Sequence, residues 1–490
     1  MLLSELLKTI GHERTFRFED REVEGIGTDS THTMQGDLFI CFAGRENDGH
    51  DFAAEAVASG AVALAVEHEL DLPVPQIVVK DGRKAASEIA AAFYGHPERK
   101  LKIIGITGTN GKTTTAHMLA SILAADGRNC GNIGTLGIFY ANRAVSPELT
   151  TPDPVHLYKV LADMAEAGME YVAMEVSAHA LYYGKVDGIP FEAGIYTNFT
   201  EDHLDFFDTM ENYAAAKAKL FRKGRCRFAL FNYDDEECRR IGARCENAYS
   251  YGLENPSDVF AVDVQEDFDG CSYVINLFDE ICPIRLQMPG LYNVYNSMAA
   301  AACAKLLGIS LPSIAAGLSG LRKVSGRLEH IARVKGADIF VDFAHTPDGL
   351  EKSLLSLRRH CAGRLICVFG CGGNRDAKKR PLMGSIAART ADFLVLTSDN
   401  PRYEDPFDII LQIEKGVRQV GDNYVIVVDR ENAIGYAVDM LKEGDVLLVA
   451  GKGGETYQEI MGVRHIYSDA AAIETILGGK FLKKEKNNEK

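Results

Sequence analysis

The segment GITGTNGKTTT at residues 105–115 constrains the fold of this chain more than any other feature. It follows the apolar run LKIIGIT (101–107) and leads into AHMLASILAA (116–125), which is the order of a strand, a glycine-rich turn and a helix. The start of a helix presents free backbone N–H groups and the positive end of the helix dipole, and glycines let the backbone close around an anion. We therefore expect a phosphate-binding loop that contains Gly108, Thr109, Asn110, Gly111, Lys112, Thr113 and Thr114.

Two side chains of this loop have the chemistry of nucleotide contacts. Lys112 is placed to reach the outer phosphates, and the hydroxyl of Thr113 is placed to hold Mg²⁺. The spacing differs from the common pattern, because five residues separate Gly105 from Gly111 and only two separate Gly108 from it. A glycine turn without a ligand is therefore the alternative interpretation of the loop taken alone.

Composition and charge exclude several kinds of protein. The chain has 490 residues, 46% of them hydrophobic and 25% charged, which predicts a globular protein of several domains. Its net charge of −16 repels nucleic acid and anionic membranes, so neither is an expected partner. The sequence contains no run of 18 apolar residues, starts with a poor signal peptide and has eleven scattered cysteines without a paired CxxC motif. These features predict a cytoplasmic protein with reduced thiols and without a zinc site.

The alternation of apolar strands and helices predicts an α/β protein of three domains, which we place at residues 1–98, 99–328 and 329–490. In the first domain, strands are expected at 36–44, 61–67 and 75–81, and helices at 51–60 and 82–95.

The central domain is expected to hold a doubly wound parallel sheet like that of P-loop ATPases. Apolar strands at 171–176 and 193–199 alternate with helical stretches, so both faces of the sheet should be covered. From 226–232 through 258–290 the pattern becomes shorter and alternating, which predicts an antiparallel addition.

The third domain is expected to be a Rossmann-like sheet. Its strands are predicted at 338–344, 364–370, 392–398, 423–429 and 445–451, with helices at 347–360, 381–390 and 430–441. Polar segments with the sequences AHTPD, GCGGNRD, SDNPR and GKGGE directly follow strands. Because doubly wound sheets bind ligands at the carboxyl ends of their strands, these segments should form a site.

Three further residues of the central domain suggest chemistry beside the phosphate loop. Glu175 ends an apolar strand and is a natural Mg²⁺ ligand, although a solvated glutamate at a helix start is the alternative. His203 follows another strand as a metal ligand or as a satisfied, capping histidine. Lys217 lies on a helix with Lys219, where lysines commonly serve solubility alone.

Taken together, these motifs resemble those of the Mur ligases of peptidoglycan precursor synthesis, and the resemblance covers nearly the whole chain. The family's loop has the same GxTGTNGKT form, so the unusual spacing is a family trait. The resemblance implies that the loop binds ATP and that Thr113, Glu175, His203 and Lys217 surround two Mg²⁺ ions, with Lys217 carbamylated to N6-carboxylysine. Lys112, Lys217, Glu175 and His203 are then the expected catalytic residues. A carbamate would replace a cation with an anionic oxygen ligand.

The resemblance also assigns nucleotide and substrate contacts outside the loop. On the ATP side it implies Asn296, in GLYNVYNSMAA, together with Arg327, Asp342 and His345; a helix-capping amide remains the alternative for Asn296. The muramoyl-peptide substrate is expected at Thr150, Thr151 and Ser177, with His179 in the same motif, and the uridine diphosphate at Ser30. The family often has arginine after that serine, whereas this chain has Thr31.

The third domain should choose the amino acid that is added. Its motifs resemble those of the branch that adds meso-diaminopimelate, and they supply the residues Arg375, Asp399, Asn400, Arg402, Gly451 and Glu455. Diaminopimelate carries one more carboxylate than lysine, and an arginine such as Arg402 can hold it with two parallel hydrogen bonds. A surface ion pair of Arg402 with Glu404 or Asp405 is the alternative. The branch usually has histidine where this chain has Gly454.

The reaction that this resemblance implies is ATP-dependent amide formation on UDP-N-acetylmuramoyl-L-Ala-D-Glu. The D-Glu γ-carboxylate takes the γ-phosphoryl group of ATP, and the amine of meso-diaminopimelate attacks the resulting acyl phosphate; the enzyme is expected to be a monomer. Alternatives are addition of L-lysine or lanthionine, a folylpolyglutamate synthase-like ligase, and a nucleotide-binding regulatory module that forms no bond.

Overall fold

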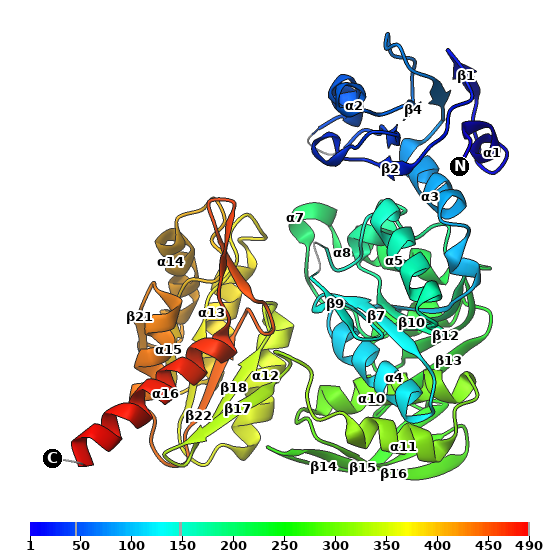
Figure 1. The fold of residues 1–490 in the computed structure, drawn as a ribbon. Coiled ribbons are helices and arrows are strands. Elements are labelled where there is room, and N and C mark those ends of the chain that lie inside the picture. The colour runs from blue at the N-terminus through cyan, green and yellow to red at the C-terminus, as the bar shows by residue number, and fades with distance from the viewer. Residues whose placement is uncertain (45–46, 147–148, 489–490) are drawn as a thin grey trace.

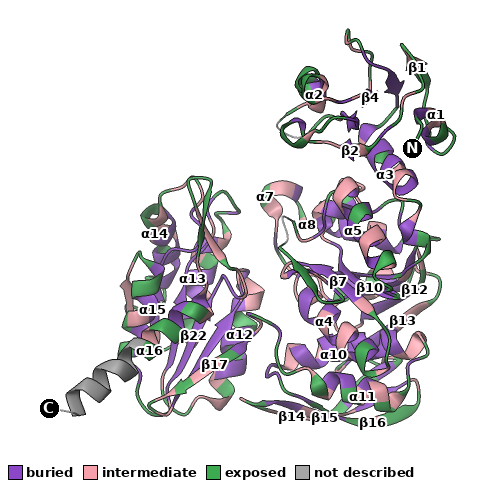
Figure 2. Ribbon diagram, in the orientation of Figure 1, coloured by how far each residue is buried: buried purple, intermediate pink, exposed green. Residues whose placement is uncertain are grey.

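The computed structural model describes residues 1–44, 47–146 and 149–488, with side chains up to residue 478. It shows three domains, each built around its own sheet, with the third domain beside the central one and the first domain beyond one end of the central domain (Figure 1). The central strands of the three larger sheets are buried between helices or loops, while edge strands and the outer helix faces carry exposed residues (Figure 2). Among the described residues, no helix is long and apolar enough to cross a membrane.

The first domain contains a sheet with the strand order β1-β5-β4-β3-β2, in which only β1 runs antiparallel to its neighbour. The strands are β1 (Arg14–Phe16), β2 (Gly25–Gly27), β3 (Asp37–Ile40), β4 (Ala63–Val66) and β5 (Gln76–Val78). The helices are α1 (Leu3–Leu7), α2 (Ala53–Ser59) and α3 (Gly82–Phe93). Every residue of β3, β4 and β5 is buried, as the continuous apolar runs predict for central parallel strands.

The central domain carries the largest sheet, with the order β16-β15-β14-β13-β12-β11-β6-β10-β7-β8-β9. Its strands are β6 (Lys102–Thr107), β7 (Cys130–Gly134), β8 (Gly137–Tyr140), β9 (Arg143–Val145), β10 (Tyr171–Glu175), β11 (Phe191–Tyr196), β12 (Cys226–Asn232), β13 (Ala248–Gly252), β14 (Val259–Asp267), β15 (Gly270–Leu277) and β16 (Glu280–Leu286). Its helices are α4 (Lys112–Ala125), α5 (Pro154–Glu166), α6 (Ala178–Tyr182), α7 (Leu204–Phe207), α8 (Met210–Ala218), α9 (Glu236–Gly242), α10 (Leu291–Leu306) and α11 (Leu311–Gly320).

The antiparallel addition is confirmed for β14, β15 and β16, but it was predicted to begin too early in the chain. Residues 226–232 form β12, which pairs in parallel with β11 and with β13. The helix α9 crosses back between β12 and β13, so the chain re-enters the sheet in the same direction. Alternating polarity alone does not reveal strand direction, which depends on the connection.

The third domain has the order β17-β18-β22-β19-β20-β21, parallel except for β17, with a separate β23–β24 hairpin. The strands are β17 (Glu329–Val334), β18 (Ala337–Asp342), β19 (Leu365–Phe369), β20 (Phe393–Leu396), β21 (Tyr424–Ile426), β22 (Val446–Ala450), β23 (Tyr457–Ile460) and β24 (Val463–Ile466). The helices are α12 (Pro347–His360), α13 (Lys379–Thr390), α14 (Pro406–Val417), α15 (Arg430–Asp439) and α16 (Asp469–Asn488). The five predicted strands and three predicted helices of this domain are confirmed.

Contacts between side chains of neighbouring domains join the three domains. The guanidinium group of Arg83 on α3 lies 4.7 Å from the ring centroids of Phe42 and of Tyr183, so it links the first domain to the central one. Between the central and third domains, Lys379 Nζ lies 3.8 Å from Asp202 Oδ1. Arg359 on α12 donates to Glu266 on β14. These contacts hold the third domain against the carboxyl edge of the central sheet.

Candidate active site

The predicted phosphate loop lies between the end of β6 and the start of α4, and two of its glycines cannot be replaced without strain. Gly108 has φ +146°, and a Cβ atom there would lie 1.9 Å from Thr197 Oγ1. Gly111 has φ +86°, and its Cβ atom would lie 2.3 Å from Asn296 Oδ1. The left-handed backbone and the close neighbours therefore explain both glycines.

Two lysines meet at one carbonyl group of this loop. Lys112 Nζ donates to the carbonyl oxygens of Gly108 and Thr109 at 2.9 and 2.8 Å, and Lys217 Nζ donates to the same Gly108 oxygen at 2.7 Å. The side chain of Lys217 is buried and lies over the Tyr213 ring at 4.5 Å. Burial lowers the pKa of Lys112, and burial together with the nearby Lys112 charge lowers the pKa of Lys217 well below its ordinary value. A neutral amine is the form of lysine that reacts with an electrophile.

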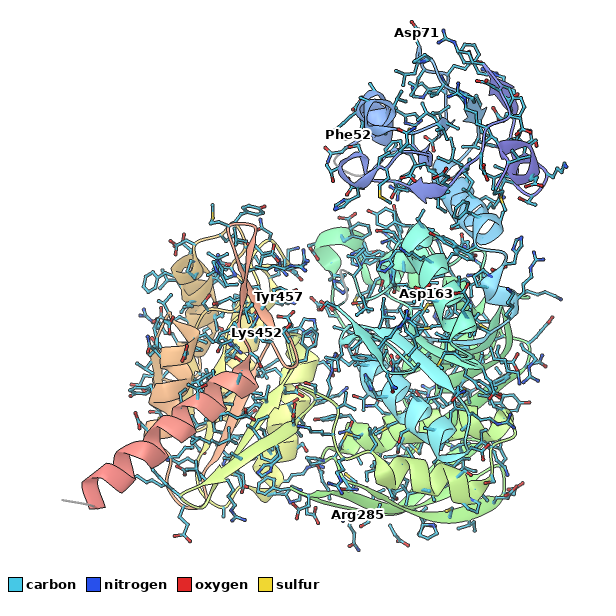
Figure 3. The ribbon with its side chains drawn as sticks, in the orientation of Figure 1. Phe52, Asp71, Asp163, Arg285, Lys452 and Tyr457 are labelled. Atoms are coloured by element: carbon cyan, nitrogen blue, oxygen red, sulfur yellow. The ribbon has the colours of Figure 1, made fainter. Side chains whose placement is uncertain are left out.

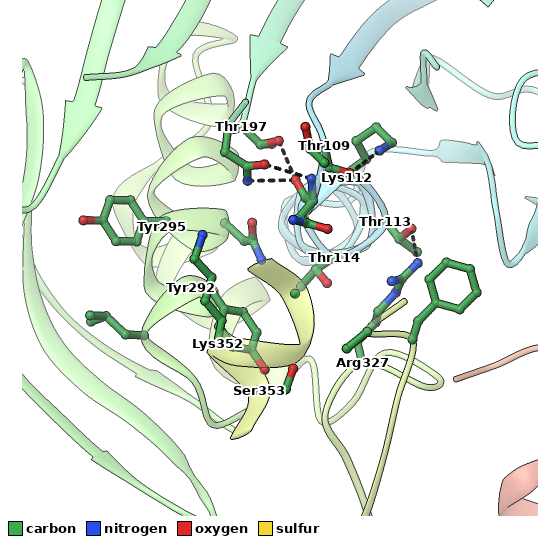
Figure 4. A pocket seen from close by; sticks show the side chains of 18 of the residues that line it. Thr109, Lys112, Thr113, Thr114, Thr197, Tyr292, Tyr295, Arg327, Lys352 and Ser353 are labelled. Atoms are coloured by element: carbon green, nitrogen blue, oxygen red, sulfur yellow. Dashed lines mark hydrogen bonds between the residues drawn. The ribbon is translucent and has the colours of Figure 1, made fainter. Parts of the chain in front are cut away.

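A cavity of about 460 Å³ opens above the loop between the central and third domains (Figure 4). The carboxyl ends of central strands contribute Glu175, Thr135 and Asn232, while the third domain contributes residues from 342 to 359. Predicted ATP contacts that line it are Thr109, Asn110, Gly111, Lys112, Thr113, Thr114, Asn296, Arg327, Asp342 and His345. Its position at the strand ends is that expected for a doubly wound sheet.

The third domain and the connection leading into it reach the loop directly. Arg327, which precedes β17, donates from Nη2 to Thr113 Oγ1 at 2.8 Å and lies 4.4 Å from the Phe343 ring centroid (Figure 4). Asn110 Nδ2 donates to Asp348 Oδ2 on α12 at 3.0 Å. A cation from the far side of the cavity therefore faces the helix start that is expected to hold phosphate.

Asp342 and His345 occupy the same wall of the cavity. The carboxylate of Asp342 accepts hydrogen bonds from the backbone N–H of Ala344 at 2.9 Å and from Ser353 Oγ at 3.0 Å, and burial raises its pKa. Burial and the nearby charge of Lys379 lower the pKa of His345 to about 4, and its Nδ1 lies 2.8 Å from the Phe343 carbonyl oxygen. His345 is therefore a neutral imidazole at pH 7.

Glu175 is tied to the motif predicted to hold the muramoyl peptide. Its carboxylate accepts from the backbone N–H and the hydroxyl of Thr135 at 2.9 and 3.1 Å, and the Thr135 hydroxyl lies 3.2 Å from that of Thr150. Thr151 Oγ1 donates to the Glu175 carbonyl oxygen at 2.9 Å and accepts from the backbone N–H of Ser177 at 3.1 Å. Thr150, Thr151 and Ser177 thus form one network that continues from the cavity.

His203 lies to one side of the loop, with a left-handed backbone (φ 56°) and Nε2 at 3.2 Å from Asp202 Oδ2. Its ring packs 4.9 Å from that of His179, and burial lowers the pKa of His203 to about 3. Within the described ranges no three His, Cys, Asp or Glu side chains converge as a metal site. Thr113 and Glu175 share the cavity and offer oxygen atoms, which suits Mg²⁺, whereas His203 and Lys217 do not line it.

The predicted amino-acid motifs gather at the carboxyl edge of the third sheet. Arg402 Nη1 donates to the Gly373 carbonyl oxygen at 2.7 Å, and its Nε lies 3.5 Å from Glu459 Oε2 on β23. The alternative ion pair with Glu404 or Asp405 is not observed, because Glu404 binds Arg380 and Asp405 caps α14. Arg375 is exposed beside the same turn, where a Cβ atom on Gly372 would lie 3.8 Å from Arg375 Cγ.

The carboxylate of Glu455 pairs with the ammonium group of a lysine of the same domain. Lys452 Nζ, which is fully buried, donates to Glu455 Oε2 at 2.8 Å and to Asn400 Oδ1 at 2.9 Å, and Asn400 Nδ2 donates to the same glutamate oxygen at 2.9 Å. Figure 3 places Lys452 and Tyr457 on the side of the third domain that faces the central domain. At Gly451, with φ +115°, a Cβ atom would lie 2.5 Å from Asp399 Oδ2.

The chain departs from the family pattern at two residues, Gly454 and Thr31. At Gly454, a Cβ atom would lie 2.7 Å from Leu136 Cδ2 and 3.0 Å from the Ser325 carbonyl oxygen, so a histidine side chain would require Leu136 to move. Thr31 donates from Oγ1 to Asp29 Oδ1 at 2.7 Å. Ser30 is buried and donates to Glu55 Oε2 at 2.9 Å, in the first domain and away from the cavity.

Several cavity residues were not predicted from the sequence. They include Thr135, Thr197, Asn198, Asn232, Asp234, Asp235, Tyr292, Tyr295, Lys352 and Ser353. Six of these ten end or follow strands β7, β11 and β12, where polar residues after apolar runs were the available signal. Tyr295 donates to Asp234 Oδ2 at 2.8 Å across the cavity wall, a pairing that no sequence pattern gives.

Comparison with known proteins agrees with this architecture. Family models match residues 22–94 ("Mur ligase family, catalytic domain"), 106–304 ("Mur ligase middle domain") and 326–453 ("Mur ligase, glutamate ligase domain"). The UDP-N-acetylmuramoyl-L-alanyl-D-glutamate--2,6-diaminopimelate ligase of Geobacillus thermodenitrificans (strain NG80-2) is 40% identical, and the match covers 94% of this chain and 96% of that protein.

Solved structures give the same result. A structure with the name of that ligase is 31% identical, has a TM-score of 0.66 and is matched over 94% of this chain and 95% of its own. The MurF ligase from Thermotoga maritima in complex with ADP shares the fold at 19% identity and a TM-score of 0.66, over 94% and 98% of the two chains.

Proposed function

Since this chain belongs to the Mur ligase family, we propose that it is an ADP-forming ligase that joins meso-2,6-diaminopimelate to UDP-N-acetylmuramoyl-L-alanyl-D-glutamate. The observation that carries this proposal is the cavity in which Lys112, Thr113 and Glu175 face Arg327 from the opposite wall. Such a cavity can hold a nucleoside triphosphate between the two domains, with its phosphates at the start of α4. The reaction belongs to the synthesis of peptidoglycan precursors, and a cytoplasmic location remains a prediction.

In the proposed reaction, the D-Glu γ-carboxylate attacks the γ-phosphorus of ATP and ADP leaves. The acyl phosphate that forms is attacked by the amine of diaminopimelate, and phosphate departs as the amide forms. Lys112 and Arg327 are placed to neutralise charge on the transferring group, and the network from Thr150 to Ser177 is placed to orient the acceptor. Closure of the third domain over the bound substrates would exclude water, which would otherwise hydrolyse the acyl phosphate.

We assign Mg²⁺ to Thr113 and Glu175, whose oxygen atoms share the cavity. These residues would hold Mg²⁺, which would supply positive charge beside the phosphates. A second ion at His203 and a carbamate on Lys217 are also part of the proposal. They are supported by the position of the Lys217 amine at the back of the loop and by its lowered pKa.

The amino acid is proposed to bind at the carboxyl edge of the third sheet. The Arg402 guanidinium group is supported there by Gly373 and lies near Glu459, so an incoming carboxylate would compete with Glu459 for it. Asp399, Asn400 and Gly451 lie in the adjoining loops. Arg375 and Arg402 both lie beside Gly372, where a Cβ atom would be 3.8 Å from Arg375 Cγ and 3.0 Å from Arg402 Nη1, so Arg375 is proposed to assist. Because Lys452 already pairs with Glu455, the substrate ammonium would share this carboxylate or displace Lys452. The uridine diphosphate is proposed to bind at Ser30 in the first domain.

The test is phosphate release by the purified protein with ATP, Mg²⁺ and UDP-N-acetylmuramoyl-L-Ala-D-Glu, with meso-diaminopimelate, L-lysine or lanthionine added in parallel. Release that requires both the muramoyl dipeptide and diaminopimelate is the expected result. Preference for lysine or lanthionine would keep the ligase and overturn the choice of amino acid.

Release with none of the three amino acids would favour a folylpolyglutamate synthase-like ligase or a nucleotide-binding module. Light scattering of the same sample tests the proposed monomer.

A further inference from the structure

Arg430 is a cation in the interior of the third domain to which the proposed reaction gives no role. It is the first residue of α15, its side chain is 1% exposed, and it lies under the carboxyl edge of the sheet. Its Nε and Nη2 atoms donate to the two carboxylate oxygens of Asp469, at the start of α16, at 2.7 and 2.8 Å. Asp469 is 0% exposed, so this is a fully buried bidentate ion pair.

The remaining donors of the same guanidinium group reach two strand ends. Nη1 donates to the Ser398 carbonyl oxygen at 3.2 Å, and Nη2 donates to the Ala450 carbonyl oxygen at 2.9 Å. Ser398 follows β20 and Ala450 ends β22, and β19 lies between these strands in the sheet. Arg430 therefore ties together two strand ends that do not hydrogen-bond to each other.

These two carbonyl groups immediately precede the proposed amino-acid loops. Ser398 is followed by the DNPR loop (399–402), and Ala450 is followed by the GKGGE loop (451–455). The loops touch, because Lys452 Nζ donates to Asn400 Oδ1, and because a Cβ atom on Gly451 would lie 2.5 Å from Asp399 Oδ2. A small shift of one loop against the other would therefore separate groups that must act on one ligand.

We propose that the Arg430–Asp469 pair is a positioning device that fixes the DNPR loop relative to the GKGGE loop and thereby sets the affinity for the amino acid. The effect of the pair on amino-acid affinity rests on the proposed function. Buried ion pairs commonly contribute no more stability than apolar residues of similar volume, so stability alone does not explain a buried pair. The hydrogen bonds from Arg430 to the Ser398 and Ala450 carbonyl oxygens supply a role besides stability, because a pair of apolar side chains could not make them.

The experiment compares the full chain with Arg430→Met/Asp469→Leu, which removes both charges of the pair. The control is Arg364→Met/Asp445→Leu, at the opposite, amino edge of the same sheet. Arg364 also pairs with a buried aspartate, Asp445, at 2.6 Å, and donates to a carbonyl oxygen, that of Met440, at 2.8 Å. The readouts are KM for meso-diaminopimelate, KM for ATP, the thermal midpoint and amide hydrogen exchange of residues 398–402 and 451–455.

The Arg430→Met/Asp469→Leu variant should raise KM for diaminopimelate by about 10- to 100-fold, as expected for a displaced contact. Its KM for ATP should stay within about twofold of the parent, since the nucleotide cavity is untouched. Exchange of both loops should rise by about tenfold because their common anchor is lost. The control variant Arg364→Met/Asp445→Leu should leave loop exchange and KM for diaminopimelate unchanged.

Unchanged loop exchange in the folded Arg430→Met/Asp469→Leu variant would overturn the proposal. So would equal rises in both KM values together with a lowered thermal midpoint, since that pattern marks a purely structural role. If the parent chain forms no ADP with diaminopimelate, the proposed function fails, while loop exchange still decides whether the pair holds the loops.

Discussion

Alanine at Gly111 and at Gly127 should separate backbone strain from steric overlap in the phosphate loop. The two glycines flank the same helix, α4, and both have positive φ, +86° and +74°. At Gly111 a Cβ atom would lie 2.3 Å from Asn296 Oδ1, whereas at Gly127 it would meet no atom within 4 Å. The Gly127→Ala variant therefore measures the strain alone.

The structure sets the size of the difference. A left-handed alanine costs about 1–2 kcal/mol at either position. Overlap in a packed interior adds about 1–3 kcal/mol at Gly111 alone. Asn296 is buried and bonded to Asn293 and Thr115, so it cannot turn away without losing those contacts. For a domain of this size class, each kcal/mol shifts the thermal midpoint by about 2–4 °C. Gly111→Ala should therefore unfold about 2–12 °C below Gly127→Ala.

The assay is thermal unfolding of both variants at one scan rate, with KM for ATP measured in parallel. KM for ATP should rise only in Gly111→Ala, because the loop must move to make room for the methyl group. The double variant Gly111→Ala/Asn296→Ala should recover the overlap part of the lost stability. Equal midpoints for the two single variants would refute the reasoning, since the clash with Asn296 would then be absent.

Two further predictions concern the cavity, and a third concerns the loop at Gly454. Arg327→Met should raise KM for ATP by about 10-fold or more, because a charge-assisted hydrogen bond contributes about 1.5–3 kcal/mol. The control Arg322→Met, on the exposed connection, should leave KM for ATP unchanged. Equal effects of the two variants would contradict the role of Arg327. The unfolded chain binds a proton at His345 below about pH 6.5 and the folded chain only below about 4, so the free energy of unfolding should fall between these pH values as acid is added. His345→Gln should flatten that slope, and an unchanged slope would refute this. Gly454→His should lower activity and thermal stability, because its Cβ atom would lie 2.7 Å from Leu136 Cδ2. Adding Leu136→Ala to this variant should restore part of both, and no recovery would count against the clash as the cause.

Much of the fold could be predicted from the sequence because local patterns determine it. The glycines at 108 and 111, the apolar strands and the polar residues that follow them placed the loop and the sheet edges. The helix α14 was not predicted, although Asp405 and Pro406 form a start signal and Ile409, Ile410 and Ile413 form its buried face. The direction of β12 was predicted wrongly because it depends on the crossover through α9.

The site was harder to predict because its contacts join distant segments. The hydrogen bonds from Arg327 to Thr113 and from Asn110 to Asp348 span more than 200 residues. The pairing of Lys452 with Glu455 was also unforeseen, although the two residues are close in sequence, because burial of a lysine side chain depends on tertiary packing. The roles proposed for His203, Lys217 and Ser30 stay predictions.

Lys112 and Lys217 meet at the Gly108 carbonyl oxygen, and this affects the number of protons that the protein takes up when it binds a nucleotide. Burial lowers the pKa of both amines, so each amine loses its proton at a lower pH than an exposed lysine would. A triphosphate beside Lys112 favours its charged form and raises its pKa, so binding draws in protons at pH values between the pKa of the free protein and that of the complex. The heat of ATP binding should accordingly change with the ionisation enthalpy of the buffer, and titrations in phosphate and in Tris would count the protons taken up.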